Sequence, residues 1–142
     1  MSKRAAGYVG DSTLGKAVYA SRRFKAGDFI SKIKGKVISE PGYGSDYCMD
    51  LGAGDVMEPR APFRFLNHSC EPNCELIILE DTDSSQMCLY AVQSIKPNDE
   101  MTIDYGWEAD AAIPCRCGAA TCRGWIVSRD QLPLARKRAK SA

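Results

Sequence analysis

The chain has 142 residues, the length of one domain, and 44% of them are hydrophobic, which is enough for a core that buries about 70% of the unfolded surface. Nineteen Lys and Arg residues against eighteen Asp and Glu residues give a net charge of +1, which excludes a general binder of polyanions. No apolar run approaches the roughly 20 residues of a membrane span, and no apolar stretch follows the polar residues 1–10, so we expect neither a membrane segment nor a secretory signal peptide.

Short β-branched, aromatic or alternating segments follow one another along the chain and predict a mainly β protein. The expected strands are residues 17–20, 29–33, 36–38, 47–51, 75–80, 87–92 and 100–105. Segments rich in Gly, Pro, Asn, Asp and Ser separate these strands and are typical of turns; they are residues 25–28, 41–44, 52–55, 81–85 and 96–99. Residues 58–66 are expected to hold a short helical turn.

The C-terminal residues 134–142 are basic and have no apolar pattern. Their charges come from Arg136, Lys137, Arg138 and Lys140. We therefore predict a solvated or frayed tail. A contact between this tail and phosphate or an acidic partner is the alternative.

Seven cysteines are the unusual feature of the composition. They are Cys48, Cys70, Cys74, Cys88, Cys115, Cys117 and Cys122. Their odd number, without a secretory signal, predicts reduced thiols in a cytoplasmic or nuclear compartment. Cys48 and Cys88 fall in expected strands, where a thiol behaves as a small apolar side chain.

Three of these cysteines form a cluster in the sequence. Cys115, Cys117 and Cys122 have the spacing C-x-C-x4-C. A structural zinc site takes four ligands in a tetrahedron, so three clustered thiols require a fourth ligand from elsewhere. Cys70 and Cys74 are the candidates for that ligand. The alternative is that all seven thiols are core residues.

Three motifs occur in a fixed order along the chain. Residues 64–73 read RFLNHSCEPN, residues 100–105 read EMTIDY, and residues 115–124 read CRCGAATCRG. Together they resemble the signatures of SET-domain protein-lysine methyltransferases that carry a post-SET zinc motif. Residues 46–51 resemble the tyrosine-bearing strand of that family, and the resemblance runs from about Leu14 to Ile126.

The resemblance implies a fold of small curved β-sheets around a pseudoknot, in which the N-H-S-C and D-Y segments cross. It divides the chain into a SET domain at residues 1–110, a post-SET zinc segment at residues 111–127 and a basic tail at residues 128–142. Threaded chains are rare among folds, so hydrophobic periodicity does not suggest this topology.

The implied reaction transfers a methyl group from S-adenosylmethionine to the ε-amine of a lysine in a histone or other protein. Free lysine has a pKa of about 10.4, and a narrow apolar channel beside a sulfonium favours its neutral form, so no dedicated base is expected. By resemblance Tyr105 is catalytic, with its hydroxyl at the methyl-transfer site, and Tyr47 lines the lysine channel. A buried strand tyrosine bonded to backbone is the alternative for Tyr105.

The resemblance also assigns cofactor-binding, channel and metal-binding residues. Those expected to bind the cofactor are Gly15, Lys16, Ala17, Arg64, Asn67, His68 and Trp125; those of the substrate channel are Ile33, Ile103 and Trp107; those of the zinc site are Cys70, Cys115, Cys117 and Cys122. Arg116 and Arg123 would offset part of the negative charge of four thiolates. Arg64 has a simple salt bridge as its alternative role, and Trp125 has core packing.

Several positions depart from the family pattern. Ala17 replaces a glycine of the cofactor loop, and Ile33 replaces a tyrosine of the lysine pocket. Lys32, Lys34 and Lys36 place positive charge on the expected peptide side, which favours a substrate less basic than a histone tail. Ile103 has no hydroxyl to restrict a methylated amine, so we expect di- or trimethylation.

Two other functions compete with this one. The first is a catalytically degenerate SET fold that binds a peptide or a partner. The second is a zinc-stabilised module that binds nucleic acid through the basic tail, which the near-zero net charge and the lack of an aromatic-basic pattern disfavour.

Overall fold

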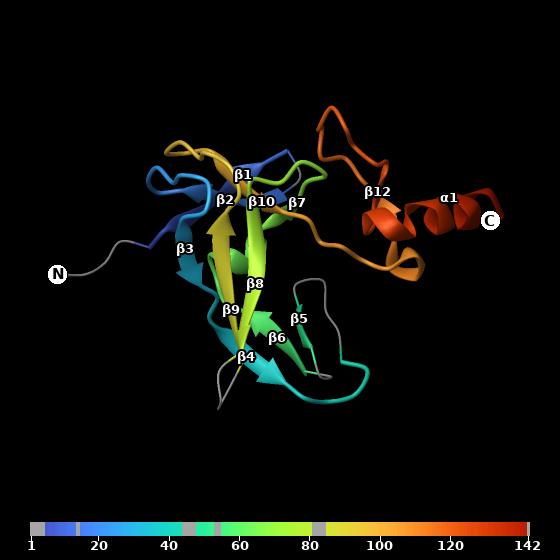
Figure 1. Ribbon diagram of the computed structural model, residues 1–142, viewed down its shortest axis with the longest axis horizontal. Helices are drawn as coiled ribbons and strands as arrows, with labels where there is room; N and C mark the ends of the chain where they lie inside the picture. Colours follow the sequence, from blue (N-terminus) through green and yellow to red (C-terminus); the bar gives the residue numbers. More distant parts are fainter. Residues whose placement is uncertain (1–4, 14, 44–47, 53–54, 81–84, 142) are drawn as a thin grey trace.

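The computed structural model describes residues 5–13, 15–43, 48–52, 55–80 and 85–141 of the chain (Figure 1). Its strands are β1 (Gly7–Ser12), β2 (Gly15–Ala20), β3 (Phe29–Lys32), β4 (Gly35–Ile38), β5 (Met49–Gly52), β6 (Asp55–Pro59), β7 (Asn67–His68), β8 (Cys74–Glu80), β9 (Ser85–Ala91), β10 (Glu100–Ile103), β11 (Ile113–Pro114) and β12 (Trp125–Ile126). Its helices are the short η1 (Phe63–Phe65), η2 (Ala109–Ala111) and η3 (Arg129–Gln131), and α1 (Leu132–Ser141). The mainly β class predicted from the sequence is confirmed.

The strands form small sheets. Their orders are β1-β2-β10-β7, β3-β9-β8, β4-β6-β5 and β11-β12. Figure 1 shows the first three of these sheets gathered in one body, with β12 and α1 set to one side of it.

The sheet β1-β2-β10-β7 brings two of the sequence motifs together. β10 runs antiparallel to β2 and parallel to β7, where Thr102 lies opposite Asn67 and Ile103 lies opposite His68. The Ser69 N–H donates to the Ile103 carbonyl at 3.0 Å and continues the parallel contact. The N-H-S-C and D-Y segments therefore lie side by side, as the resemblance implied.

Two separate clusters of buried side chains hold the chain together. The larger one lies under the first three sheets; its members that are at most 1% exposed are Val18, Ala20, Phe24, Ile33, Cys74, Leu89, Ala91, Ile95 and Met101. The smaller one consists of Ala109, Val127 and Ala135, with Ala112, Trp125 and Leu132 packed against it. The C-terminal part is thus held by a much smaller core than the body that the first three sheets form.

All seven predicted strands are present, but five observed strands were missed. β1, β6, β7, β11 and β12 are short or rich in glycine and charged residues, so their hydrophobic pattern is weak. β6 begins at Asp55, which is the last residue of the predicted turn 52–55. The helical turn expected within residues 58–66 is confirmed as η1.

The prediction of a frayed tail at residues 134–142 is wrong, because α1 covers most of this segment. Ala135 is 3% exposed and packs against Val127 and Ala109 in the smaller cluster. Ala, Arg and Lys have high intrinsic helix propensity, and one buried contact is enough to fix such a segment. Arg136, Lys137, Arg138 and Lys140 remain exposed. Among the helices of the described residues, none is both long and apolar enough to cross a bilayer.

Gly35 is required where β4 pairs with β6. A Cβ atom at this position would lie 2.2 Å from the carbonyl oxygen of Glu58, a backbone atom that cannot move away. We expect Gly35→Ala to destabilise the protein by about 1–3 kcal/mol. Urea unfolding measures this, with Lys36→Ala in the same strand as the control because its side chain is exposed. An unchanged midpoint for Gly35→Ala would contradict the prediction.

Candidate active site and metal centre

Asn67 connects three strands at the point where β7 meets β10. Its Nδ2 donates to the Lys16 carbonyl at 3.0 Å and to Glu100 Oε2 at 3.2 Å. Asn73 makes a similar connection from the end of the same motif, donating to the Glu100 carbonyl at 2.8 Å and accepting from the Thr102 N–H at 2.9 Å. The start of β2 and the N-H-S-C and D-Y segments are therefore one hydrogen-bonded unit.

Tyr105 follows β10 and is half-buried beside this crossing. Its hydroxyl donates to the Leu66 carbonyl at 2.6 Å, and its ring lies 5.4 Å from the ring of His68 and 5.1 Å from that of Trp107. The bond to Leu66 is the one a structural tyrosine would make. It also holds the phenol oxygen and a carbonyl oxygen close together.

His68 is buried and neutral. Its Nδ1 accepts a hydrogen bond from the Tyr105 N–H at 3.1 Å, so the ring proton is on Nε2, which lies 3.4 Å from Cys70 Sγ. Burial lowers the pKa of His68, although the nearby Asp104 carboxylate opposes this. The 3.7 Å approach of Nδ1 to Asp104 is consequently not an ion pair. These contacts support a structural role for His68 and not proton transfer.

Cys70, Cys115, Cys117 and Cys122 come together as a candidate metal centre. Their sulfur atoms all lie within 4.8 Å of one another, and those of Cys70 and Cys115 are 3.9 Å apart. A tetrahedral zinc ion with Zn–S bonds of about 2.3 Å separates its sulfur ligands by about 3.8 Å, so the four thiols fit this ion. Burial alone would raise the pKa of Cys117, but hydrogen bonds from backbone N–H groups and neighbouring thiols lower it to about 6, which favours the thiolate that a metal requires.

Cys74, the other candidate for the fourth ligand, lies elsewhere. It is 1% exposed in the larger core, and its Sγ donates to Asn73 Oδ1 at 3.3 Å. Burial raises the pKa of Cys74 to about 12, so this thiol stays protonated. The choice of Cys70 over Cys74 thus agrees with the geometry.

Arg123 makes an ion pair that sequence reasoning missed. Its Nη2 lies 2.5 Å from Asp104 Oδ2, its Nη1 lies 3.3 Å from Asp104 Oδ1, and Nη1 also donates to the Val127 carbonyl. Its backbone N–H donates to Cys70 Sγ at 3.3 Å. The sequence suggested only that Arg123 offsets thiolate charge, and it gave Asp104 no role. The sequence did offer one signal, because Asp104 directly precedes Tyr105 and Arg123 directly follows Cys122.

The family model for the SET domain matches residues 15–106. The chain belongs to the SET-domain family. It is 30% identical over 128 residues to "Histone-lysine N-methyltransferase, H3 lysine-4 specific" of Aspergillus oryzae, covering 77% of this chain and 10% of that protein. It is 32% identical over 122 residues to "Histone-lysine N-methyltransferase ash1" of Drosophila melanogaster, covering 74% of this chain and 6% of that protein.

The fold is also similar to that of a solved SET protein. The crystal structure of KRYPTONITE in complex with mCHH DNA, an H3(1-15) peptide and SAH matches with a TM-score of 0.74 and 26% identity, over 89% of this chain and 30% of that chain. The predicted SET fold is thereby confirmed. The chain spans about a tenth or less of the two histone-lysine methyltransferases above.

The residues expected to form the cofactor loop lie at the start of β2. Gly15 has a φ of +103°, which only glycine adopts without strain, and among the described residues no atom beyond its chain neighbours lies within 4 Å of the place where its Cβ would be. Lys16 makes an exposed ion pair with Asp11 at 2.8 Å, and its carbonyl is held by Asn67. Ala17 is fully buried. Arg64 is half-buried in η1, with its guanidinium 5.7 Å from the Phe65 ring.

The predicted channel residues separate into two environments. Ile33 and Ile103 are 1% and 5% exposed in the larger core, against which Tyr105 packs. Trp107 is half-buried beside Tyr105. Trp125, which was expected to bind the cofactor, is half-buried in β12 and packs against the smaller cluster. Core packing is the alternative role considered for it. Tyr47 lies outside the described residues.

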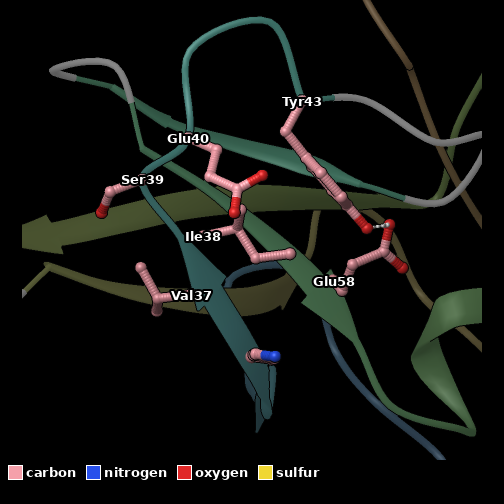
Figure 2. A pocket seen from close by; sticks show the side chains of 7 residues that line it. Val37, Ile38, Ser39, Glu40, Tyr43 and Glu58 are labelled. Carbon is pink, nitrogen blue, oxygen red and sulfur yellow. Dashed lines mark hydrogen bonds between the residues drawn. The ribbon is translucent and has the colours of Figure 1, made fainter.

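A surface hollow of about 410 Å³ lies apart from these residues (Figure 2). It is lined by Lys36, Val37, Ile38, Ser39, Glu40, Tyr43 and Glu58. The Tyr43 hydroxyl donates to Glu58 Oε1 at 3.0 Å, and this bond raises the pKa of Tyr43. Its mixed charges differ from the apolar channel expected for a lysine, and none of the predicted site residues that the structure describes lines it.

Proposed function

We propose that this SET domain is a protein-lysine N-methyltransferase that uses S-adenosylmethionine. The observation that carries the proposal is the phenol of Tyr105, held against the Leu66 carbonyl where the two crossing segments of the family meet. Relatives named histone-lysine N-methyltransferases, and a similar structure solved with SAH and an H3 peptide, support it.

The donor, when bound, supplies a methyl carbon on a positively charged sulfur. The lone pair of a neutral lysine amine forms the new C–N bond while the C–S bond breaks and its electrons pass to sulfur. The proton that the amine carries afterwards is lost to water. Because the three reacting atoms must be collinear, most of the catalysis comes from positioning.

The described residues supply that positioning. The Tyr105 and Leu66 oxygens are 2.6 Å apart and form a small electronegative site, which attracts a methyl group carrying partial positive charge. Asn67 fixes the Lys16 carbonyl, and the open backbone at Gly15 leaves room for the close approach of a ligand. His68 is neutral and fully used in holding Tyr105, so the amine loses its charge through desolvation and not through a base.

The four-thiolate zinc site belongs to the same proposal. Zinc bound by Cys70, Cys115, Cys117 and Cys122 would tie residues 114–126 to the end of β7, next to Tyr105. Trp125 belongs to the part of the chain that the metal would hold. Such an ion would be structural, because four protein ligands would leave no open position for substrate.

The substrate is a protein or peptide lysine, and two observations bear on its surroundings. The relative from Aspergillus oryzae is named as specific for lysine 4 of histone H3, which favours a nuclear substrate. Lys32, Lys34 and Lys36 are exposed, which opposes a strongly basic peptide if they lie along its path. We propose a lysine in a sequence less basic than a histone tail.

The deciding experiment is methyl transfer from labelled S-adenosylmethionine to nuclear and cytoplasmic lysate proteins and to an H3 peptide. We expect label on lysine in at least one protein, and stronger labelling of peptides with fewer Arg and Lys neighbours. Binding of peptide without label transfer would support the degenerate module instead, for which Ala17 and Ile33 are the sequence argument.

The product should carry more than one methyl group. Ile103 is buried in the larger core and has no hydroxyl that could hold a water against a methylated amine. Mass spectrometry of the labelled peptide over time should show dimethyl- or trimethyllysine. Accumulation of monomethyllysine alone at completion would contradict this prediction.

A further inference from the structure

The cysteine cluster and the Tyr105 backbone belong to one closed ring of contacts. Arg123 N–H donates to Cys70 Sγ at 3.3 Å, and the Arg123 guanidinium holds Asp104 at 2.5 Å. Asp104 is bonded covalently to Tyr105, whose N–H donates to His68 Nδ1 at 3.1 Å. His68 Nε2 lies 3.4 Å from Cys70 Sγ and closes the ring. Each step between the cluster and Tyr105 is one hydrogen bond or one covalent link.

The side chain of Arg123 is the most firmly held part of this ring. Its side chain is 6% exposed and contacts both Asp104 oxygens and the Val127 carbonyl. A buried guanidinium that lost these partners would remain desolvated and unpaired, so the geometry is strongly held. The planar fork of arginine makes two of these contacts at once, which the single ammonium of lysine does not.

Asp104 extends this constraint to both sides of Tyr105. Its Oδ1 accepts a hydrogen bond from the Gly106 N–H at 3.0 Å, beyond Tyr105 in the chain. Gly106 has a φ of +62°, so the backbone turns sharply directly after Tyr105. Arg123 therefore holds a carboxylate that brackets the residue proposed to orient the methyl transfer.

We propose that Arg123 is a positioning residue that couples metal binding at the cysteine cluster to the orientation of Tyr105. The inference rests on the proposed function for its catalytic consequence, but the coupling itself is a property of the structure. Metal binding fixes Cys70 and Cys122, these fix the backbone of Arg123, and Arg123 fixes Asp104 and Tyr105. Without the guanidinium, metal binding and Tyr105 remain, but the two are no longer connected through Asp104.

Trp107 provides a measurement of this coupling that does not need activity. The chain has two tryptophans, and the Trp107 ring lies 5.1 Å from that of Tyr105. A Trp125→Phe background leaves Trp107 as the single tryptophan reporter. In this background, removal of zinc with a chelator should shift the Trp107 emission, and adding zinc should reverse the shift.

Arg123→Met and Asp104→Asn in the same background should lose at least about two thirds of that shift while they bind one zinc ion with little change in affinity. In methyl transfer, measured with Trp125 restored, Arg123→Met should lower kcat by about 10–100-fold, as is usual for groups that orient a ligand shell, with KM for the peptide within a few-fold. Arg123→Lys, which keeps the charge, should recover part of the Trp107 emission shift and part of kcat. Arg116→Lys is the matched control, because Arg116 lies between two of the cysteines but its side chain is exposed.

A full Trp107 shift in the Arg123→Met and Asp104→Asn variants would overturn the proposal. Loss of zinc binding in both would also overturn it, because Arg123 would then only build the metal site. If the Trp107 shift depends on Arg123 while the wild type transfers no methyl group to any substrate, the coupling stands and the proposed function fails.

Discussion

A Tyr105→Phe variant should fold like the wild type and lose methyl transfer by about 100-fold or more, the usual effect of deleting one oriented polar group at a reacting centre. The change removes only the hydroxyl that donates to Leu66, while the ring contacts with His68 and Trp107 can persist. The Leu66 carbonyl loses its partner, which should cost about 1 kcal/mol of stability. Initial rates at saturating peptide and donor, together with thermal unfolding, separate the two effects.

Tyr90→Phe is the matched control for this variant. Tyr90 is also half-buried and also contacts an aromatic ring, that of Phe29, but it lies in β9 away from the motif crossing. We expect the initial rate of methyl transfer by Tyr90→Phe to stay within two- or threefold of the wild-type rate. If Tyr105→Phe kept full activity, the bond to Leu66 would be structural only, and the alternative weighed for this tyrosine would be correct.

The fold was predictable in its class and in its stronger strands because these carry apolar side chains in continuous or alternating runs. β8 and β9 are examples, since the run from Leu76 to Leu79 and the segment from Met87 to Leu89 are apolar. β7 and β12 contain two residues each, so no period could be read from them. Their pairing depends on segments far away in the chain, and only the family resemblance implied the crossing at β7.

In the candidate site, too, the residues within motifs were predictable and the contacts between distant residues were not. Asn67, His68, Tyr105 and the four cysteines were predicted through motifs, and the structure brings them together. The pair of Arg123 and Asp104 was missed because a charged residue in a short motif gives no sign of its partner. The packing of α1 was missed because it depends on Ala135 meeting Val127, which a local pattern cannot show.

Removal of the metal should unfold the C-terminal part and leave folded the SET body, which is the part formed by the sheets β1-β2-β10-β7, β3-β9-β8 and β4-β6-β5. Residues 109–135 are held by the small cluster of Ala109, Val127 and Ala135, which buries too little apolar surface to be stable alone. The cysteine cluster must supply the rest of the stability there, since structural zinc contributes directly to folding. The larger core contains one thiol, Cys74, and none of the cluster cysteines, so it does not depend on the metal.

Cys115→Ser should reproduce the effect of a chelator, because a serine hydroxyl is a poor zinc ligand. We expect proteolytic cleavage within residues 111–127 to become at least about tenfold faster, methyl transfer to fall below detection, and hydrogen exchange in β8 and β9 to stay slow. Cys48→Ser is the control, because Cys48 is outside the cluster and should leave all three unchanged. Global unfolding of Cys115→Ser, with rapid exchange in β8 and β9 as well, would show instead that the metal holds both parts together. In that case the bridge from Cys70 through Arg123 to Tyr105 carries stability for the SET body as well as geometry.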